Sequence, residues 1–429
     1  GGARGAAAGA AMLAALAWVP RGAAGAGRGG GAGGGAGPSG PGSGSGSRSG
    51  SGSESGSDSE GGGPRLFKGG GDGLGGVVAP ELDEYLDGPD SDDSEEANDM
   101  LLRESDRLVL ACKNDGDYST LEAVVFEEDV SGASSGNAYV HHEMVLPAFP
   151  LAVEWLDFSP EGPSACANLC AVGTTEPVVE VFDADDPAAV EPEISLEGHS
   201  DAVLGLAWNA EYRNVLASAS ADGHVLVWDL GRGGPTARFE DLHADKVQDV
   251  AWCSGQPHIL LSGGFDQRVT VTDVRSGAAL VRCRVGADVE CVTWDPSGAH
   301  GFLASAEDGS VAYFDGRKVE GAGKKAKPVW RVRAHRKATT GLALAAGVPG
   351  LMATCSTDKT VKLWDISGAE PRELVAQNCG AGALFCCGFA PDSPCLLAAG
   401  GDTGEITFWD VRQHDQVQSA FGSTLAGPE

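Results

Sequence analysis

The sequence predicts an all-β protein, a closed propeller of seven blades preceded by a disordered N-terminal region that is rich in glycine, serine and acidic residues. Two observations carry this prediction. From about residue 104 onward, short runs of strand-forming residues alternate with Gly, Asp and Pro, which is typical of β-strands separated by turns. Many of these runs end in an aromatic residue or threonine followed by aspartate, roughly every 42 to 50 residues, which is the spacing of four-stranded propeller blades. These endings are Phe182-Asp183, Trp228-Asp229, Thr272-Asp273, Phe314-Asp315, Trp364-Asp365 and Trp409-Asp410.

The third unit along the chain shows the pattern most clearly. Gly198-His199 is followed by strand-like runs at 203–208, 215–220 and 225–229, with Asp222-Gly223 between the second and third run. An Asp-Gly pair at this place predicts a tight turn between antiparallel strands, whose residues point alternately to opposite faces. This arrangement is the signature of the WD repeat, so the predicted fold class is a seven-bladed WD40 β-propeller.

Four further units keep the same frame, one of them less regularly: residues 242–273, the run that ends at Phe314-Asp315, 334–365 and 379–410. We expect the second unit from Tyr139 to Asp183 and the first from 107–111 and 121–127. Residues 16–19 are expected to supply a strand that closes the ring across the linker. Because closure removes unpaired sheet edges, loss of that strand should destabilise the whole ring.

The composition divides the chain into five parts. Ordering a Gly/Ser-rich segment costs backbone entropy with no burial to offset it, so such a segment is expected to be a flexible linker. The expected parts are an N-terminal segment with the closing strand (1–21), the linker (22–80), an acidic segment (81–103), the propeller (104–422) and a tail (423–429). Met12 can serve as an initiator, which leaves open whether residues 1–11 belong to the natural chain.

The chain is strongly acidic, with a formal net charge of −31. Such a charge disfavours broad contact with a phosphate backbone and favours basic partners, or serves solubility alone. The acidic segment is either a solvated spacer or a docking motif, and Ser91 and Ser94 within it are candidate phosphorylation sites. The cluster of Lys324, Lys325 and Lys327 is either a solvated loop or a contact for RNA or an acidic partner.

No motif indicates a metal, a cofactor or a small-molecule substrate. The 11 cysteines include no C-x-x-C spacing and are interpreted as reduced thiols, mostly in the core. His141-His142 lies in a strand-like run, where neighbours are expected to point to opposite faces and not to share one ion. The sequence has no P-loop, and no apolar run approaches the ~20 residues of a membrane span.

The resemblance to WD repeats implies a structural hydrogen-bond network of His, Ser or Thr, Asp and Trp in each complete blade. The matching residues are His199, Ser218, Asp222 and Trp228 in the third unit, His243, Ser262 and Asp266 in the fourth, and His335, Thr354, Asp358 and Trp364 in the sixth. Thr272 replaces the Trp of the fourth unit, and Ala304 and Phe314 put the network of the fifth in doubt. Because the Ser/His/Asp sets recur with the repeat and lack a G-x-S-x-G elbow, we predict no catalytic residues and no enzyme activity.

Several longer runs resemble the periodic tryptophan protein 1 family: residues 16–19, 139–143, 146–158, 172–181, 197–203 and 213–222. The resemblance covers most of residues 104–422 and is lost between 23 and 80. It implies a non-enzymatic scaffold in ribosome biogenesis and pre-rRNA processing, located in the nucleus and nucleolus. The implied partners are ribosome assembly factors or other basic nuclear proteins, with histone or pre-rRNA association. The alternative is a chromatin-associated, histone-binding protein that regulates ribosomal DNA transcription.

Overall fold

The computed structural model describes residues 12–21, 23, 106–116, 118–127, 136–160, 167–186, 191–298, 300–318 and 327–425. All of these belong to one compact unit, formed by Gly1–Gly30 together with Met100–Glu429. The acidic segment and almost all of the expected linker lie outside the described residues. So do Ser91, Ser94, Lys324 and Lys325.

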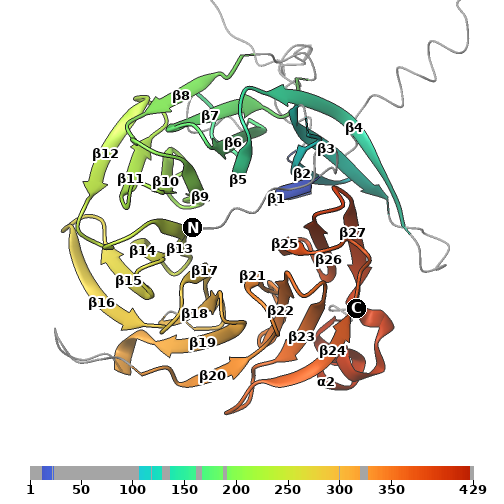
Figure 1. The fold of residues 1–429 in the computed structure, drawn as a ribbon. Coiled ribbons are helices and arrows are strands. Elements are labelled where there is room, and N and C mark those ends of the chain that lie inside the picture. The colour runs from blue at the N-terminus through green and yellow to red at the C-terminus, as the bar shows by residue number, and fades with distance from the viewer. Residues whose placement is uncertain are drawn as a thin grey trace, which may run out of the picture. The chain divides into compact units, whose positions relative to one another are not determined.

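The described strands form a ring of seven antiparallel sheets, which confirms the predicted seven-bladed propeller (Figure 1). In each blade the strands follow one another from the axis outward in chain order. Blades 1 to 3 contain β1 (Met12–Val19), β2 (Arg107–Asn114), β3 (Ser119–Glu127) and β4 (Asn137–Leu146); β5 (Pro150–Leu156), β6 (Leu169–Thr174), β7 (Val178–Asp183) and β8 (Ile194–Glu197); and β9 (Val203–Trp208), β10 (Val215–Ser220), β11 (Val225–Asp229) and β12 (Gly234–Phe239).

Blades 4 to 6 repeat this plan, whereas the described part of blade 7 has three strands. They contain β13 (Val247–Cys253), β14 (Gln256–Gly264), β15 (Arg268–Asp273) and β16 (Ala278–Arg284); β17 (Val289–Trp294), β18 (Gly301–Ala306), β19 (Ser310–Asp315) and β20 (Trp330–Arg333); β21 (Thr339–Leu344), β22 (Leu351–Ser356), β23 (Val361–Asp365) and β24 (Arg372–Gln377); and β25 (Leu384–Ala390), β26 (Ser393–Gly401) and β27 (Ile406–Asp410). Short 3-10 turns η2 (Gly316–Lys318) and η3 (Val411–Gln413) follow β19 and β27.

The second strand of a blade is buried on both faces because neighbouring blades cover both sides of each sheet. All six residues of β6, β18 and β22 are buried. These strands are rich in alanine, glycine, serine and threonine, which allow close packing of adjacent sheets. A tight turn connects the second strand of a blade to the third. In the turn between β10 and β11 of blade 3, Gly223 has a φ of +82°, a conformation that an L side chain rarely adopts.

The N-terminal strand β1 is the innermost strand of blade 1 and pairs with β2 in antiparallel register. It also contacts β5 of blade 2 and β25 of blade 7, so it lies at the junction of the first and last blades. One boundary differs from the expectation. Tyr139, which we assigned to the second unit, lies in β4, the outer strand of blade 1, because each repeat of the sequence starts near the outer strand of the preceding blade.

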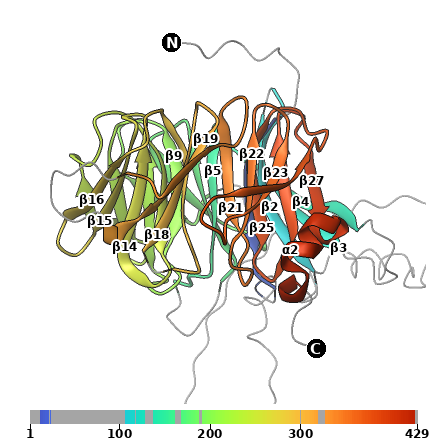
Figure 2. The same ribbon diagram turned by 90° about the horizontal axis from the view of Figure 1, so that it is seen from below.

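The chain ends in helix α2 (Asp415–Leu425), which lies on the perimeter of the ring beside blades 6 and 7 (Figure 2). Its apolar side, formed by Val417, Phe421 and Leu425, belongs to the same hydrophobic cluster as Trp409 of blade 7. No helix among the described residues is long and apolar enough to cross a membrane. The ten cysteines in the described parts of the chain are free thiols.

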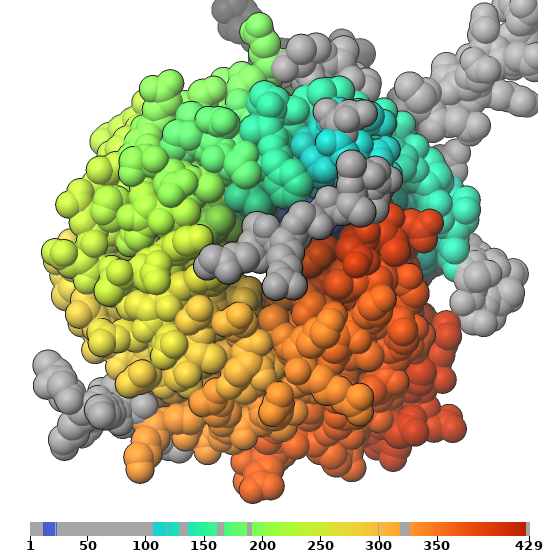
Figure 3. Space-filling view, viewed as in Figure 1, coloured from blue at the N-terminus to red at the C-terminus, as the bar shows by residue number. Residues whose placement is uncertain are grey.

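The inner strands of all seven blades surround a cavity of about 410 Å³. Figure 3 shows the blades packed side by side around the centre of the ring. The lining mixes apolar groups such as Leu206 with the acidic side chains of Asp249 and Glu290. Burial and two nearby carboxylates raise the pKa of Glu290 to about 7.

Candidate functional site

Blade 3 brings together the four residues that the WD-repeat pattern singled out. His199 Nε2 lies 2.7 Å from Ser218 Oγ, and His199 Nδ1 lies 3.0 Å from Asp222 Oδ2. The indole nitrogen of Trp228 donates to the same serine oxygen at 2.8 Å. Asp222 also accepts the backbone N–H groups of Ser200 and His224. The network therefore ties the loop before β9 to the β10–β11 hairpin.

The donors and acceptors of this network fix the proton positions. The carboxylate of Asp222 can only accept, so a neutral His199 carries its single ring hydrogen on Nδ1, facing Asp222. His199 Nε2 therefore accepts the hydrogen of Ser218, whose oxygen in turn accepts the indole N–H of Trp228. Burial lowers the pKa of His199 and so favours the neutral ring. Burial opposes ionisation of Asp222, but hydrogen bonds from Ser200, His224 and His199 outweigh it and lower the pKa of this carboxyl.

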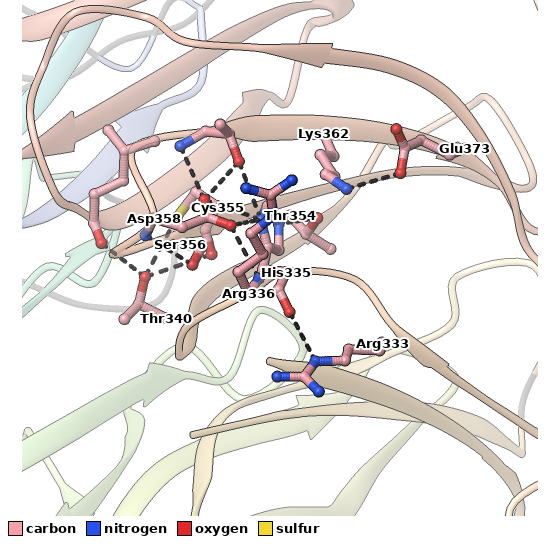
Figure 4. Close-up of polar contacts among 12 residues, drawn as sticks. Arg333, His335, Arg336, Thr340, Thr354, Cys355, Ser356, Asp358, Lys362 and Glu373 are labelled. Atoms are coloured by element: carbon pink, nitrogen blue, oxygen red, sulfur yellow. Dashed lines mark hydrogen bonds and ion pairs between the residues drawn. The ribbon is translucent and has the colours of Figure 1, made fainter. Parts of the chain in front are cut away.

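Blade 6 repeats the arrangement with threonine in place of serine (Figure 4). His335 Nε2 lies 2.8 Å from Thr354 Oγ1, and Trp364 donates to the same oxygen at 3.0 Å. Both oxygens of Asp358 lie 3.3 Å from His335 Nδ1. Burial lowers the pKa of His335, as it does in blade 3. The backbone of Arg336 also donates to Asp358, which anchors the loop before β21.

Blade 4 has this network without its tryptophan. His243 bonds Ser262 at 2.8 Å and Asp266 at 3.0 Å. Thr272 occupies the tryptophan position, and its buried hydroxyl has no hydrogen-bond partner among the described residues. The threonine is too short to reach the serine, so the sheet loses one bond and buries one unsatisfied oxygen.

In blades 5 and 7, other interactions take the place of this network. In blade 5, Ala304 and Phe314 fill the serine and tryptophan positions, and Phe314 stacks on Phe302 with 5.4 Å between ring centres. In blade 7, the indole of Trp409 donates to His414 Nε2 at 3.0 Å. Sequence reasoning missed His414 because it follows the last repeat and has no counterpart in the other units.

A second set of tryptophans, at the ends of inner strands, was also missed. Trp252 Nε1 donates to the carbonyl of Ala207 in the preceding blade, and Trp294 donates to Ala251 in the same way, each at 3.0 Å. The available signal was the aromatic residue that ends the first strand of most units, about 20 residues before the Asp-containing endings. These two indoles fasten β13 to β9 and β17 to β13.

Two buried carboxylates bridge inner strands in the opposite direction. Glu154 of blade 2 accepts the backbone N–H of Trp208 at 3.2 Å, and Asp249 of blade 4 accepts that of Val292 at 2.8 Å. Burial raises the pKa of Glu154 to about 7 and that of Asp249 to about 6. These acids therefore link blade 2 to blade 3 and blade 4 to blade 5.

His141 and His142 do not point apart as expected. The pairing of β4 with β3 shifts between Val140 and His142, which marks a bulge at His141. The bulge turns the two rings toward each other, with 2.8 Å between their Nδ1 atoms. Among the described residues no three His, Cys, Asp or Glu side chains are arranged to hold a metal ion. Of the predicted lysine cluster, the structure describes only Lys327, which is exposed.

The fold and the repeated His–Ser/Thr–Asp–Trp network define the class: this is a WD-repeat β-propeller protein. The model of the WD domain, G-beta repeat, matches residues 190–229 and 326–365, which contain the two complete networks. Among solved structures, a chain of the Crystal Structure of Mitotic Checkpoint Complex aligns with a TM-score of 0.55 and 18% identity, covering 70% of this chain and 87% of that chain. At that identity the likeness shows the fold alone.

Two relatives identify the family. The chain is 31% identical to Periodic tryptophan protein 1 of Saccharomyces cerevisiae, over 80% of this chain and 70% of the relative. It is 29% identical to Periodic tryptophan protein 1 homolog of Drosophila melanogaster, over 78% of this chain and 74% of the relative. The chain belongs to the periodic tryptophan protein 1 family of WD-repeat proteins.

Proposed function

We propose that the protein is a non-enzymatic interaction scaffold in ribosome biogenesis and pre-rRNA processing, acting in the nucleus and nucleolus. The observation that carries this proposal is the family membership. A propeller supports the role physically, because a rigid ring presents its two faces and its perimeter to separate partners.

The charge of the chain selects the class of partner. A net charge of −31 attracts basic proteins at long range and speeds their association. Ribosome assembly factors and other basic nuclear proteins fit this field. Pre-rRNA would then associate through those proteins or through the lysine cluster of Lys324, Lys325 and Lys327.

The Ser–His–Asp sets support a structural role. The side chain of Ser218 is completely buried, and its oxygen is shared by His199 and Trp228. A substrate carbonyl would have to displace the indole to reach that hydroxyl. Thr354 is buried to the same extent and bonded in the same way in blade 6. We therefore propose that both sets hold the blades together and perform no acyl transfer.

Affinity purification of the full chain from nuclear extract, with and without RNase, tests the proposal. Pre-ribosomal proteins and precursor rRNA should co-purify, and the proteins should remain after RNase. Recovery of nucleosomes without assembly factors would replace the proposal with its alternative, a chromatin-associated histone-binding protein that regulates ribosomal DNA transcription. Histone tails are basic, so charge alone does not separate the two functions.

Two sites that lie wholly or mostly outside the described residues remain proposals. Phosphorylation of Ser91 and Ser94 would add further negative charge to the acidic segment. Mass-spectrometric mapping of the native protein would show both serines unmodified if this is wrong. Reversal of Lys324, Lys325 and Lys327 to glutamate should reduce RNA crosslinking, and unchanged crosslinking would exclude the cluster as an RNA contact.

A further inference from the structure

Among the described residues, blade 7 has no fourth strand, whereas every other blade has one. Its sheet consists of β25, β26 and β27, and no described strand lies on the outer side of β27 (Figure 1). After β27 the chain turns into η3 and α2 and does not return along the sheet. In the part of the chain that the structure describes, the outer N–H and C=O groups of β27 therefore form an open edge, which can pair with another extended chain.

The exposure of the β27 side chains also indicates a missing fourth strand. Ile406 is half-buried, and so is Phe408, although the ring of Phe408 already stacks on Phe126 and lies edge-on to Trp18 of blade 1. Val361 and Leu363, which hold the same two positions in β23 beneath the fourth strand β24, are 0% exposed. The third strand of blade 7 thus remains partly uncovered where its counterpart in blade 6 is closed.

The chain's own fourth strands show what fits such a position. Residues 281–285 and 330–334 share one alternation, apolar–Arg–apolar–Arg–apolar, with sequences Val-Arg-Cys-Arg-Val and Trp-Arg-Val-Arg-Ala. Their apolar members lie in hydrophobic clusters and their arginines are exposed. The fourth strands of blades 2 to 6 are 4, 6, 7, 4 and 6 residues long, so a segment of this size is sufficient.

The charges around β27 favour a basic occupant. Residues 402–415 contain four carboxylates and one arginine. Arg412 is held by Asp410 at 2.8 Å, whereas Asp402 and Glu405 are exposed. In blade 5 the counterpart of Glu405 is Ser310, which lies opposite Arg333 in the strand register. An added strand with the same alternation would place a cationic side chain opposite Glu405.

We propose that β27 is the docking site for an extended segment of a partner protein, in which apolar residues alternate with arginine or lysine and which completes blade 7 as its fourth strand. Backbone pairing along β27 supplies affinity, an apolar residue covers Ile406, and a basic residue faces Glu405. That the partner is a basic protein rests on the proposed function. The place and geometry of docking rest on the structure of blade 7 alone.

The test uses the full chain and a synthetic peptide with the sequence of residues 328–335, which contains the alternation of β20. Hydrogen exchange should show the outer amides of β27 exchanging roughly 100-fold faster than those of β23 in the free protein. The peptide should slow exchange in β27. A peptide N-methylated at alternate amides, which cannot form the ladder, should have no effect.

Two matched variants test the charge contribution. Glu405→Arg should weaken peptide binding roughly three- to ten-fold, because a favourable charge contact becomes repulsive. Glu211→Arg, an exposed position on blade 3, makes the same charge change and should leave binding unaltered. Equal losses in both variants would mean that only the overall charge is recognised and would overturn the proposed site.

Further outcomes separate this inference from the proposed function. If β27 is already protected in the free chain, its edge is covered by the chain itself or by a second copy, and the inference is wrong. Equal protection by the N-methylated peptide would also contradict it. If the peptide protects β27 but no ribosome assembly factor co-purifies with the chain, the docking site stands and the proposed function falls.

Discussion

The indole nitrogen of Trp18 donates a hydrogen bond of 2.9 Å to the carbonyl oxygen of Gly388, joining residues 370 positions apart. The same type of bond links Trp252 to Ala207 and Trp294 to Ala251 inside the ring. The N-terminal strand thus joins blade 1 to blade 7 by the same indole-to-carbonyl hydrogen bond that joins blades 3, 4 and 5. Ring closure depends on a strand separated from the rest of its blade by more than 80 residues of sequence.

Loss of the Trp18 side chain should therefore loosen the whole ring. We expect Trp18→Ala to lower the free energy of unfolding by roughly 2–4 kcal/mol, since it removes both the hydrogen bond and the packing on Phe408. Trp18→Phe keeps most of the packing and should cost about 1 kcal/mol. Urea unfolding measures both. Tyr212→Ala, at an aromatic residue that is 54% exposed, is the control and should change little.

The network aspartates should contribute more to the free energy of unfolding than an aspartate in a surface ion pair. Asp222→Ala removes partners from a buried imidazole and two backbone N–H groups, and should destabilise by roughly 2–4 kcal/mol. Asp358→Ala should do the same in blade 6. Asp308 occupies the same turn position in blade 5, where it pairs with the partly exposed Arg331, so Asp308→Ala should cost less than about 1 kcal/mol. Equal costs at all three positions in chemical denaturation would refute the network argument.

Replacing threonine by valine should raise the stability of the folded protein at Thr272 and lower it at Thr354. The buried hydroxyl of Thr272 is unsatisfied, so the isosteric Thr272→Val should stabilise by about 1 kcal/mol. Thr354→Val removes a hydroxyl that bonds both His335 and Trp364, and should destabilise by roughly 2 kcal/mol. Thermal unfolding of the two variants should therefore shift in opposite directions. A shift of the same sign in both would contradict the assignment.

Glu154 should make stability depend on pH. Its pKa is raised by burial to about 7, above the ordinary value of 4.5. The folded state therefore binds more protons than the unfolded state between these values, and the stability falls as the pH rises from about 4.5 to about 7. Glu154→Gln should flatten this slope and stabilise the protein by about 1–2 kcal/mol at pH 8, with little effect at pH 4.5. An unchanged pH profile in the variant would show that Glu154 titrates normally.

Much of the fold could be predicted because the repeat is local. The third strands of blades 2 to 7 each end in an Asp, and the third and sixth units carry their own turn residues, so these units can be recognised without knowledge of their neighbours. The same holds for their networks, whose members lie within about 30 residues of one another. His199 and Trp228 could be assigned to one network from the sequence because the blade that contains them is one continuous segment.

The contacts between blades could not be predicted in this way. Trp18, Glu154 and Asp249 bond backbone groups of other blades, and no local pattern states which carbonyl or N–H will face them. The bulge that turns His141 toward His142 is another example, because strand alternation alone predicts the opposite.

The sequence by itself determined the class of fold, the number of blades, the network residues and the family, because these depend on short-range spacing and on runs of matched residues. The sequence also indicated that an N-terminal strand closes the ring, but only the tertiary structure decided that this strand is the innermost one of blade 1 and bonds blade 7 through Trp18. It also decided that the described part of blade 7 has three strands. Both depend on which sheet edges meet when the ring closes. That outcome is set by packing and hydrogen bonding between segments hundreds of residues apart, and not by the pattern within any one of them.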